Sequence, residues 1–325
     1  MEDLQARPFS FREIRTVPEV INAAFDFVRL NFRVLARGIL LYIAPLMLVC
    51  HFLLEYTLSD SRMLALMETL SDGAVMSRSA PFDVAESALV MFLALLLLFA
   101  SFALLIAYTF GAVRVYMRGD GSVLQLEDVW RETKAMFWKV VGTNTLLSLV
   151  IGGCMAVFAV VVAFLFMVFY GLGLLAYVGV LVLWVFLVTR YSLFYPVCFL
   201  ENKKLGAAFE QSRELVEGRW WQTLGLILFG AMLSYAFNAL TTLPALLFSL
   251  LLSMGIIPEY ALYDPSSMAS ILQALLSAVF STAGQVMFLF LLLGITLHFF
   301  SQMERQQGLA LAAEVERIGM PETSV

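Results

Sequence analysis

Charged residues are scarce in this chain of 325 residues. Asp, Glu, Lys and Arg together make up 14% of it, whereas a soluble domain usually carries roughly 25%. Hydrophobic residues make up 61%, and the mean hydropathy is +0.88. A soluble fold cannot bury this much apolar surface, because a large share of any folded surface stays in contact with water. The composition therefore predicts an integral membrane protein, and it excludes a nucleic-acid-binding protein and a disordered chain.

The residues that usually build catalytic and metal sites are also scarce. The chain has 2 His residues, which excludes a histidine metal cluster, and its 3 Cys residues lie in apolar runs without the spacing of metal ligands or of a disulfide framework. A phosphate-binding glycine loop, a Gly-x-Ser-x-Gly elbow and paired intramembrane carboxylates are missing from the sequence. We therefore predict no catalytic residues, no metal and no cofactor, and expect that the protein is not an enzyme.

Long hydrophobic runs are what the chain has in abundance. A helix needs about 20 apolar residues to cross roughly 30 Å of hydrocarbon. Six runs are long enough: about Gly38–Thr57, Glu86–Ala112, Gly142–Phe169, Leu174–Phe199, Gln222–Met254 and Ala269–Met303. The alternation typical of membrane β-strands is absent, so the predicted fold is all-α, a helical membrane bundle in a single domain of residues 1–325.

Two of these runs carry further local predictions. The fifth run is too long for a perpendicular crossing, so it must tilt, kink at Pro244 or extend beyond the lipid. The third and fourth runs are separated only by a short predicted turn at Tyr170–Gly173.

The distribution of Lys and Arg predicts the orientation in the membrane. Eighteen of the 20 basic residues lie before the first run, between the second and third, near the end of the fourth run (Arg190) or between it and the fifth, or after the sixth; the opposite side has only Arg62 and Arg78. Cytoplasmic loops carry the excess of basic residues in membrane proteins. We therefore expect a multi-pass protein of the bacterial cytoplasmic (inner) membrane, with both termini in the cytoplasm.

An amphipathic stretch precedes the first, third and fifth runs. In the first stretch, apolar residues recur at helical spacing, namely Val17, Ile21, Phe25, Val28, Phe32 and Leu35. Thr16 and Glu19 have the spacing of a capping box. Ser122 with Gln125, and Asn202, are the predicted caps of the second and third stretches, and Gly218 is the predicted stop of the third.

These stretches predict an internal repeat. We interpret the chain as three tandem segments, about 16–118, 122–200 and 202–303, followed by a cytoplasmic tail, 304–325. Each segment would combine an interfacial amphipathic helix with a transmembrane hairpin. The alternative is that any six-span protein has basic cytoplasmic links with amphipathic ends.

Polar residues inside the apolar runs form the first candidate site. Asn144, Asn238 and Gln285 lie within predicted spans, where polar groups are costly and usually face protein. They either form hydrogen bonds between helices or line a substrate path. His51 and Glu55 lie four residues apart on one helix face. They form either a hydrogen-bonded pair or a proton or cation site.

A second candidate, a structural or binding motif, follows the fourth run. Pro196 ends regular helix near the membrane surface, and Arg190 can extend toward water or pair with an acidic residue such as Glu201. Gly218 breaks the following helix. The motif consists of Arg190, Tyr191, Pro196, Glu201, Ser212, Gly218, Trp220 and Trp221.

This motif resembles the membrane domain attached to some bacterial glycerophosphoryl diester phosphodiesterases, and its stand-alone relatives of uncharacterised function. The resemblance is strongest over residues 190–225, and the opening Val20–Phe25 is similar to stand-alone members. It implies a multi-span membrane fold and says nothing about catalysis. A phosphodiesterase barrel would need about 250 further residues, so the resemblance does not extend to that activity.

Two functional hypotheses remain open. The first is a non-enzymatic scaffold or accessory subunit that organises a membrane complex or its lipid surroundings. Its expected partners are membrane lipids and a protein at the cytoplasmic face, with no nucleic acid. The second is a small transporter or lipid-handling protein with a site between its helices.

Overall fold

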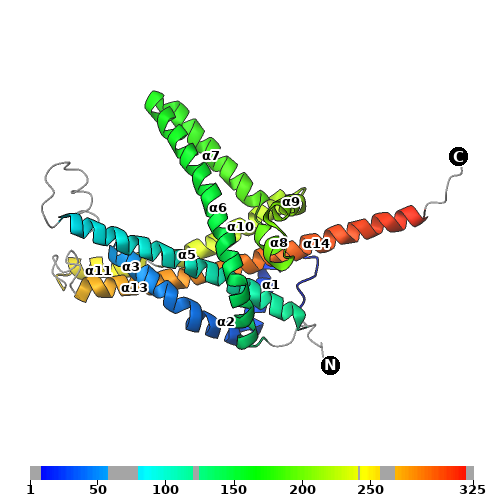
Figure 1. The fold of residues 1–325 in the computed structure, drawn as a ribbon, viewed down its shortest axis with the longest axis horizontal. Coiled ribbons are helices and arrows are strands. Elements are labelled where there is room, and N and C mark those ends of the chain that lie inside the picture. Colours follow the sequence, from blue (N-terminus) through cyan, green and yellow to red (C-terminus); the bar gives the residue numbers. More distant parts are fainter. Residues whose placement is uncertain (1–8, 58–79, 120–123, 241, 257–267, 320–325) are drawn as a thin grey trace. The chain divides into compact units, whose positions relative to one another are not determined.

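The structure is a computed structural model that describes residues 9–57, 80–119, 124–240, 242–256 and 268–319. Every regular element in these ranges is a helix (Figure 1). Six of the described helical segments are long and apolar enough to cross a membrane: Phe32–Glu55, Ala88–Arg118, Leu126–Val168, Tyr170–Leu200, Trp220–Phe248 and Met268–Gly308. The prediction of an all-α membrane protein with six spans is therefore confirmed.

The chain packs as two compact units, each assembled from separated parts of the sequence. Unit 1 contains Met1–Phe32, Ala107–Gly230 and Phe290–Val325, and unit 2 contains Arg33–Ile106 and Ala231–Leu289. These boundaries differ from those of the three tandem segments, so the repeat stays a prediction.

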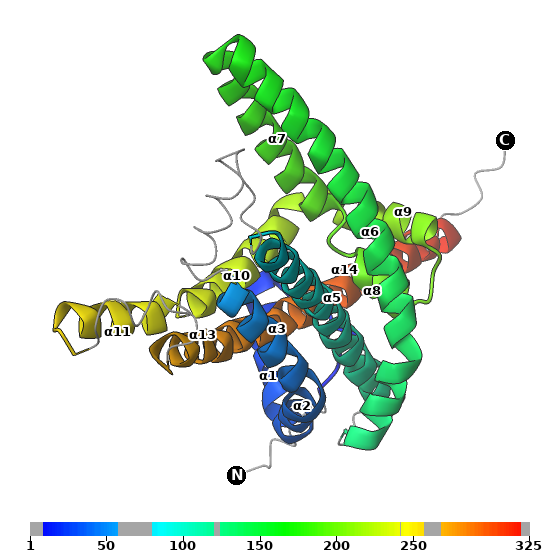
Figure 2. The ribbon, with the colours of Figure 1, turned by 60° about the vertical axis from the view of Figure 1, so that its left-hand side comes forward.

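Unit 2 is built around two helices that lie side by side. It contains most of α2 (Phe32–Gly38), the π-helical turn η1 (Ile39–Ile43), α3 (Ala44–Thr57), α11 (Thr242–Ser253) and α13 (Met268–Val286). The first part of α5 (Ala80–Arg118) also belongs to it. Helix α3 packs along α13, and α11 also contacts α13 (Figure 2).

The fifth span breaks near Pro244, which is one of the three possibilities that the sequence left open. Two residues separate the end of helix α10 (Trp220–Ala239) from the start of α11. Proline lacks the N–H that would bond to the carbonyl of Leu240, and its ring clashes with that carbonyl. A break at this point lets Pro244 occupy the first turn of the new helix, where its missing N–H costs nothing.

The sixth span differs from the single uninterrupted run that the sequence predicts. It is interrupted at Met287, between α13 and α14 (Phe288–Gly319). Helix α14 then continues through residues 304–319, which the sequence assigns to a cytoplasmic tail.

Helix α1 (Val17–Leu30) opens unit 1 with the predicted cap. The Thr16 backbone N–H donates to Glu19 Oε2 at 2.7 Å, and both halves of the capping box are present. The predicted apolar stripe is not its buried face. The buried residues are Val20, Ala23, Ala24 and Phe27, whereas Phe25 is 42% exposed. Small residues allow closer helix contact, and bulky apolar residues carry little cost on a surface that faces lipid.

A long hairpin projects from the rest of unit 1 (Figure 1). It consists of α6 (Leu126–Val168) and α7 (Tyr170–Arg190), joined by Phe169 alone. The prediction of a separate interfacial helix at its start is wrong, because α6 runs without a break from Leu126 into the membrane span.

The predicted turn at Tyr170–Gly173 is also wrong, because these residues form the first turn of α7. Gly173 is required there for a steric reason. A Cβ at this position would lie 2.3 Å from the Phe166 ring.

Two short helices, α8 (Phe194–Leu200) and α9 (Leu205–Val216), complete the part of unit 1 that follows the hairpin. The predicted cap Asn202 instead takes a left-handed conformation, with φ of 57°, and Lys204 precedes α9 as its N-cap. Gly218 has φ of 78°, which confirms it as the stop after α9.

The cap predicted for the second stretch is not formed by Gln125 either, since its side chain makes no capping bond at the start of α6. Its predicted companion, Ser122, lies outside the described residues.

Candidate functional site at the charged end of unit 1

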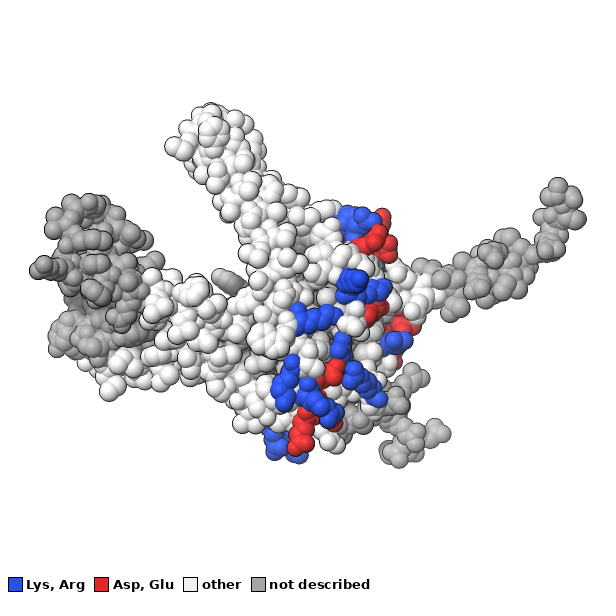
Figure 3. All heavy atoms as spheres, in the orientation of Figure 1, with Lys and Arg blue, Asp and Glu red and all other residues white. Residues whose placement is uncertain are grey.

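Charged side chains of unit 1 gather at one end, away from the tip of the hairpin (Figure 3). The sequence explains this separation, because no charged residue occurs between Val140 and Thr189. The charges lie instead where α5 ends, where α6 begins, and around α8 and α9. This end of unit 1 contains a network of ion pairs and hydrogen bonds that joins α5, α6 and α8.

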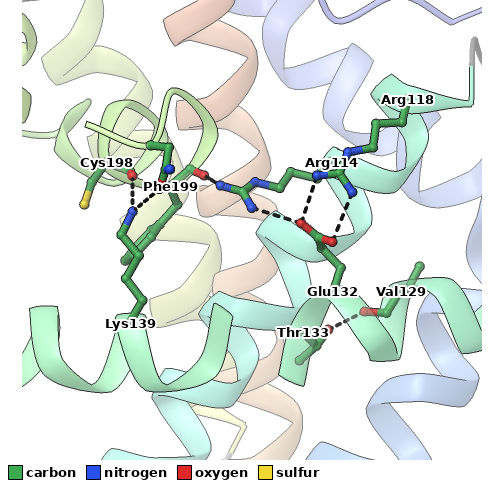
Figure 4. Close-up of polar contacts among 9 residues, drawn as sticks. Arg114, Arg118, Val129, Glu132, Thr133, Lys139, Cys198 and Phe199 are labelled. Carbon is green, nitrogen blue, oxygen red and sulfur yellow. Dashed lines mark hydrogen bonds and ion pairs between the residues drawn. The ribbon is translucent and has the colours of Figure 1, made fainter. Parts of the chain in front are cut away.

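Glu132 of α6 is the centre of that network (Figure 4). Its carboxylate accepts from Arg114 Nη1 at 2.9 Å, and from Arg118 Nη1 and Nη2 at 3.1 and 3.3 Å. Arg114 and Arg118 are four residues apart on α5, so both guanidinium groups emerge on one helix face. Because Glu132 and Arg114 are only 16% and 20% exposed, losing either partner leaves a poorly solvated charge.

Arg114 also ties this pair to α8, since its Nη2 donates to the carbonyl oxygen of Phe199. Lys139 of α6 makes a second link to the same segment. Its Nζ donates to the Cys198 carbonyl at 3.1 Å and to Asn202 Oδ1 at 2.6 Å. The left-handed backbone of Asn202 is thus part of a lysine contact and not a helix cap.

Helices α5 and α6 approach closely beside this network. A Cβ on Gly111 would lie 3.1 Å from Thr133 Oγ1 and 3.4 Å from the Val129 carbonyl oxygen. The Thr133 hydroxyl is satisfied by donating to that same carbonyl at 2.7 Å. The close contact places Glu132, next to Thr133, within reach of the arginines on α5.

A pocket of about 410 Å³ opens beside the network. Five charged residues contribute to its lining: Arg12, Arg114, Arg118, Glu201 and Glu304. Asn202, Gln307, Leu200, Met117, Met303 and Phe300 complete it. The pocket therefore combines basic and acidic groups at the end of an apolar helix bundle.

The motif around Arg190 is assembled largely through contacts that shape the chain. The Ser212 hydroxyl donates to the Arg190 carbonyl at 3.3 Å, and the Tyr191 ring packs edge-on against Phe209. The Arg190 guanidinium lies 5.5 Å from the centre of the Phe186 ring. It forms no ion pair with Glu201 or with the other acidic residues of this described segment.

The rest of the motif divides between core and surface. The prediction that Pro196 ends a helix is wrong: α7 already ends at Arg190, and Pro196 is buried in the first turn of α8, where no N–H is required. Trp220 stacks on Phe186 at a centroid distance of 6.2 Å, whereas Trp221 is 78% exposed. Glu201 is the motif residue that reaches the pocket, and it pairs with Lys203 at 3.1 Å.

The predicted polar cluster is distributed between the two units. Asn144 belongs to unit 1, where it is buried and its Oδ1 accepts from the Tyr195 hydroxyl at 3.0 Å. Asn238 and Gln285 belong to unit 2. Asn238 Nδ2 donates to the Ser234 carbonyl at 2.8 Å.

Asn238 and Gln285 do not bond to each other. Asn238 packs against the neighbouring Gly284, where an added Cβ would lie 2.9 Å from its Oδ1. Gln285 Oε1 and Ser234 Oγ are buried without a hydrogen-bond partner among the described residues. The described part of unit 2 therefore has two unsatisfied polar atoms, both within candidate membrane spans.

The two histidines contact threonines. His51 Nδ1 lies 3.1 Å from Thr282 Oγ1 in unit 2, so the neighbour of the ring is not the predicted Glu55. His298 Nε2 lies 3.0 Å from Thr223 Oγ1 in unit 1. No group of His, Cys, Asp and Glu residues suited to a metal is present in the described ranges.

The sequence reasoning missed Glu132, Arg12, Lys139 and Glu304 as site residues. One signal was available for Glu132: it is an acidic residue within an amphipathic stretch that follows two arginines spaced by one helical turn. The sequence holds no comparable signal for Arg12 or Glu304, which come from opposite ends of the chain.

No protein-family model matches this sequence, no curated protein is significantly similar to it, and no solved structure matches its fold. The resemblance to phosphodiesterase membrane domains therefore stays a prediction from the motif residues.

Proposed function

We propose that this multi-span membrane protein is a non-enzymatic scaffold or accessory subunit, and that its α6–α7 hairpin packs against transmembrane helices of a partner protein. The observation that carries the proposal is the exposure of the hairpin. None of the 18 residues in the most apolar window of α6 is buried, and the corresponding window of α7 is 6% buried.

The hairpin surface suits contact with other helices. Gly152, Gly153 and Gly179 have no atom within 4 Å of an added Cβ. Small residues let transmembrane helices approach closely, and close packing is the main attraction between helices in lipid. Because the hairpin lacks charged residues over this length, its expected partner is a membrane-embedded helix and not a soluble domain.

Affinity purification from native membranes tests this proposal. The tagged full chain should recover one membrane protein in a fixed ratio. Gly152→Leu should reduce the recovered partner about tenfold, which corresponds to a loss of about 1.4 kcal/mol. Gly225→Leu is the matched control, because Gly225 of α10 is also open to an added Cβ.

Recovery of the partner at equal levels with Gly152→Leu and wild type would contradict the proposal. So would purification of the wild-type chain without any stoichiometric partner. Both variants must elute from size exclusion as the wild type does, because a misfolded chain would lose partners for an unrelated reason.

The second candidate is a small transporter or lipid-handling protein, and the unsatisfied atoms of unit 2 favour it. Buried polar atoms normally have partners, and a passing substrate would supply one to Gln285 Oε1 and Ser234 Oγ. Water-soluble thiol reagents test this in a background without native cysteines. Gln285→Cys should react quickly and Ala278→Cys, which is fully buried on the same helix, should not. Equal protection of both would count against a substrate path.

A further inference from the structure

The pocket at the charged end of unit 1 contains two charged groups of opposite sign that have no partner among the described residues. Arg12 and Glu304 both line it. Neither side chain forms an ion pair or hydrogen bond with any described residue. The other charged lining residues are already engaged: Arg114 and Arg118 by Glu132, and Glu201 by Lys203.

An unpartnered guanidinium and an unpartnered carboxylate in one pocket match a ligand that carries both charges. Guanidinium groups bind phosphate oxygens well, because their N–H donors match the geometry of the anion. Arg118 lines the same pocket as Arg12, and its guanidinium keeps donors free beyond its pairing with Glu132, because its side chain is 68% exposed and a guanidinium has five donors. Glu304 supplies acceptor oxygens for a cationic group at the other end of the ligand.

The lining favours a primary amine over a quaternary ammonium. A primary ammonium donates three hydrogen bonds, which carboxylate and amide oxygens accept. The pocket offers such oxygens on Glu201, Glu304 and Asn202. Quaternary ammonium groups are held mainly by aromatic cages, and Phe300 is the one aromatic among the described lining residues.

The pocket also lies where membrane spans end. Candidate spans end at Arg118, Leu200 and Gly308, and lining residues come from each of these ends. Headgroups occupy the boundary between hydrocarbon and water, and a cavity of about 410 Å³ is in the range that small ligands fill.

We infer that this pocket binds a phosphoethanolamine group, with its phosphate at Arg12 and Arg118 and its primary amine at Glu304. Either a phospholipid headgroup or a free phosphoethanolamine compound carries this chemistry. No lining residue of the pocket belongs to the hairpin, so this inference and the proposed function are tested independently of each other.

Binding of short-chain lipids to the delipidated full chain in detergent tests the inference. Dihexanoyl phosphatidylethanolamine should bind about tenfold more tightly than dihexanoyl phosphatidylglycerol, which has no cationic group, or phosphatidylcholine, whose quaternary ammonium donates no N–H hydrogen bond to the carboxylate. Free phosphoethanolamine distinguishes the two sources. Much weaker binding assigns the site to lipid, and equal binding assigns it to the soluble compound. Equal affinity for all three lipids would overturn the inference.

Two substitutions separate the contributions of the pocket. Glu304→Gln should abolish the preference for phosphatidylethanolamine over phosphatidylglycerol, whereas Arg12→Gln should weaken binding of both about tenfold. Arg131→Gln is the control, since Arg131 pairs with Asp128 at 2.7 Å and does not line the pocket. Neither Arg12 nor Glu304 has a partner to lose within the described chain, so both variants should melt as the wild type does. Retention of the preference in Glu304→Gln would overturn the assignment of the amine.

Discussion

The charged end and the hairpin of unit 1 differ in how much of their surface contacts the rest of the chain. At the charged end, Glu132, Arg114 and Lys139 connect α5, α6 and α8 through side chains and backbone carbonyls. Along the hairpin, α6 and α7 pack against each other and leave their remaining surface exposed. Helix α6 contains both regions in one continuous helix. One end of α6 is therefore held by polar contacts to other helices of the chain, whereas the other end leaves an apolar surface exposed.

This difference has a physical basis. Charges near a membrane boundary must be paired within the protein or solvated, because leaving one poorly solvated and unpaired is costly. An apolar helix surface has no such requirement, since lipid solvates it as well as protein does. The charged end should consequently be sensitive to substitution, and the hairpin should tolerate changes that leave it apolar.

Removing the central carboxylate should produce the largest effect. Glu132→Gln leaves Arg114 poorly solvated without its ion pair, and it should lower the free energy of unfolding by about 2 kcal/mol. Thermal unfolding of the detergent-solubilised protein measures this. Asp128→Asn, which removes an exposed pair on the same helix, should cost less than about 0.5 kcal/mol. Equal losses in the two variants would show that the network does not hold the helices together.

A pair of glycine substitutions compares the two regions directly. Gly111→Ala forces a Cβ against Thr133 and should destabilise the protein by about 1 kcal/mol or more. Gly152→Ala in the hairpin meets no atom, so it should leave the melting temperature unchanged or raise it. A decrease with Gly152→Ala as large as with Gly111→Ala would mean that the hairpin is packed within the chain.

The buried amide of Asn144 lies in α6 where the polar contacts of the charged end give way to the exposed hairpin. Tyr195→Phe removes the donor to Asn144 Oδ1, and the loss of one hydrogen bond should cost about 1 kcal/mol. Tyr177→Phe, at an exposed position of α7, is the matched control and should be neutral. If both variants melted alike, the Tyr195–Asn144 bond would not contribute to stability.

The smallest effect should come from the cap of α1. Hydrogen bonds from the Thr16 backbone and side chain lower the pKa of Glu19. A carboxyl with a lowered pKa stabilises the fold above its ordinary pKa near 4.5, and that contribution disappears as the pH falls through its folded value. Glu19→Gln should therefore melt slightly lower than wild type at pH 7, with the difference vanishing in acid. A difference independent of pH would exclude the ionised cap as its source.

Local features of the sequence predicted much of the fold. Hydropathy located the six spans, because it depends only on neighbouring residues. Thr16 with Glu19, Pro244 and Gly218 each act within one helical turn, so their effects could be predicted without the fold. The buried face of α1 could not be, because in a membrane both the packed face and the lipid-facing surface of a helix are apolar.

The candidate site was harder to predict, because its residues meet only through tertiary structure. Arg114 reaches Phe199, 85 residues away, and the pocket joins Arg12 to Glu304. The predicted motif around Arg190 does assemble, but mostly through backbone and ring contacts. Asn144 and Gln285 were grouped by polarity alone, and polarity does not specify which helices pack together.

Photo-crosslinking in native membranes tests the central claim about the hairpin most directly. A benzoylphenylalanine placed at Gly153 should give an adduct with one other membrane protein, whereas the same probe at Gly225 should give none. Adducts at position 153 that contain only lipid, or only other parts of the same chain, would contradict the account.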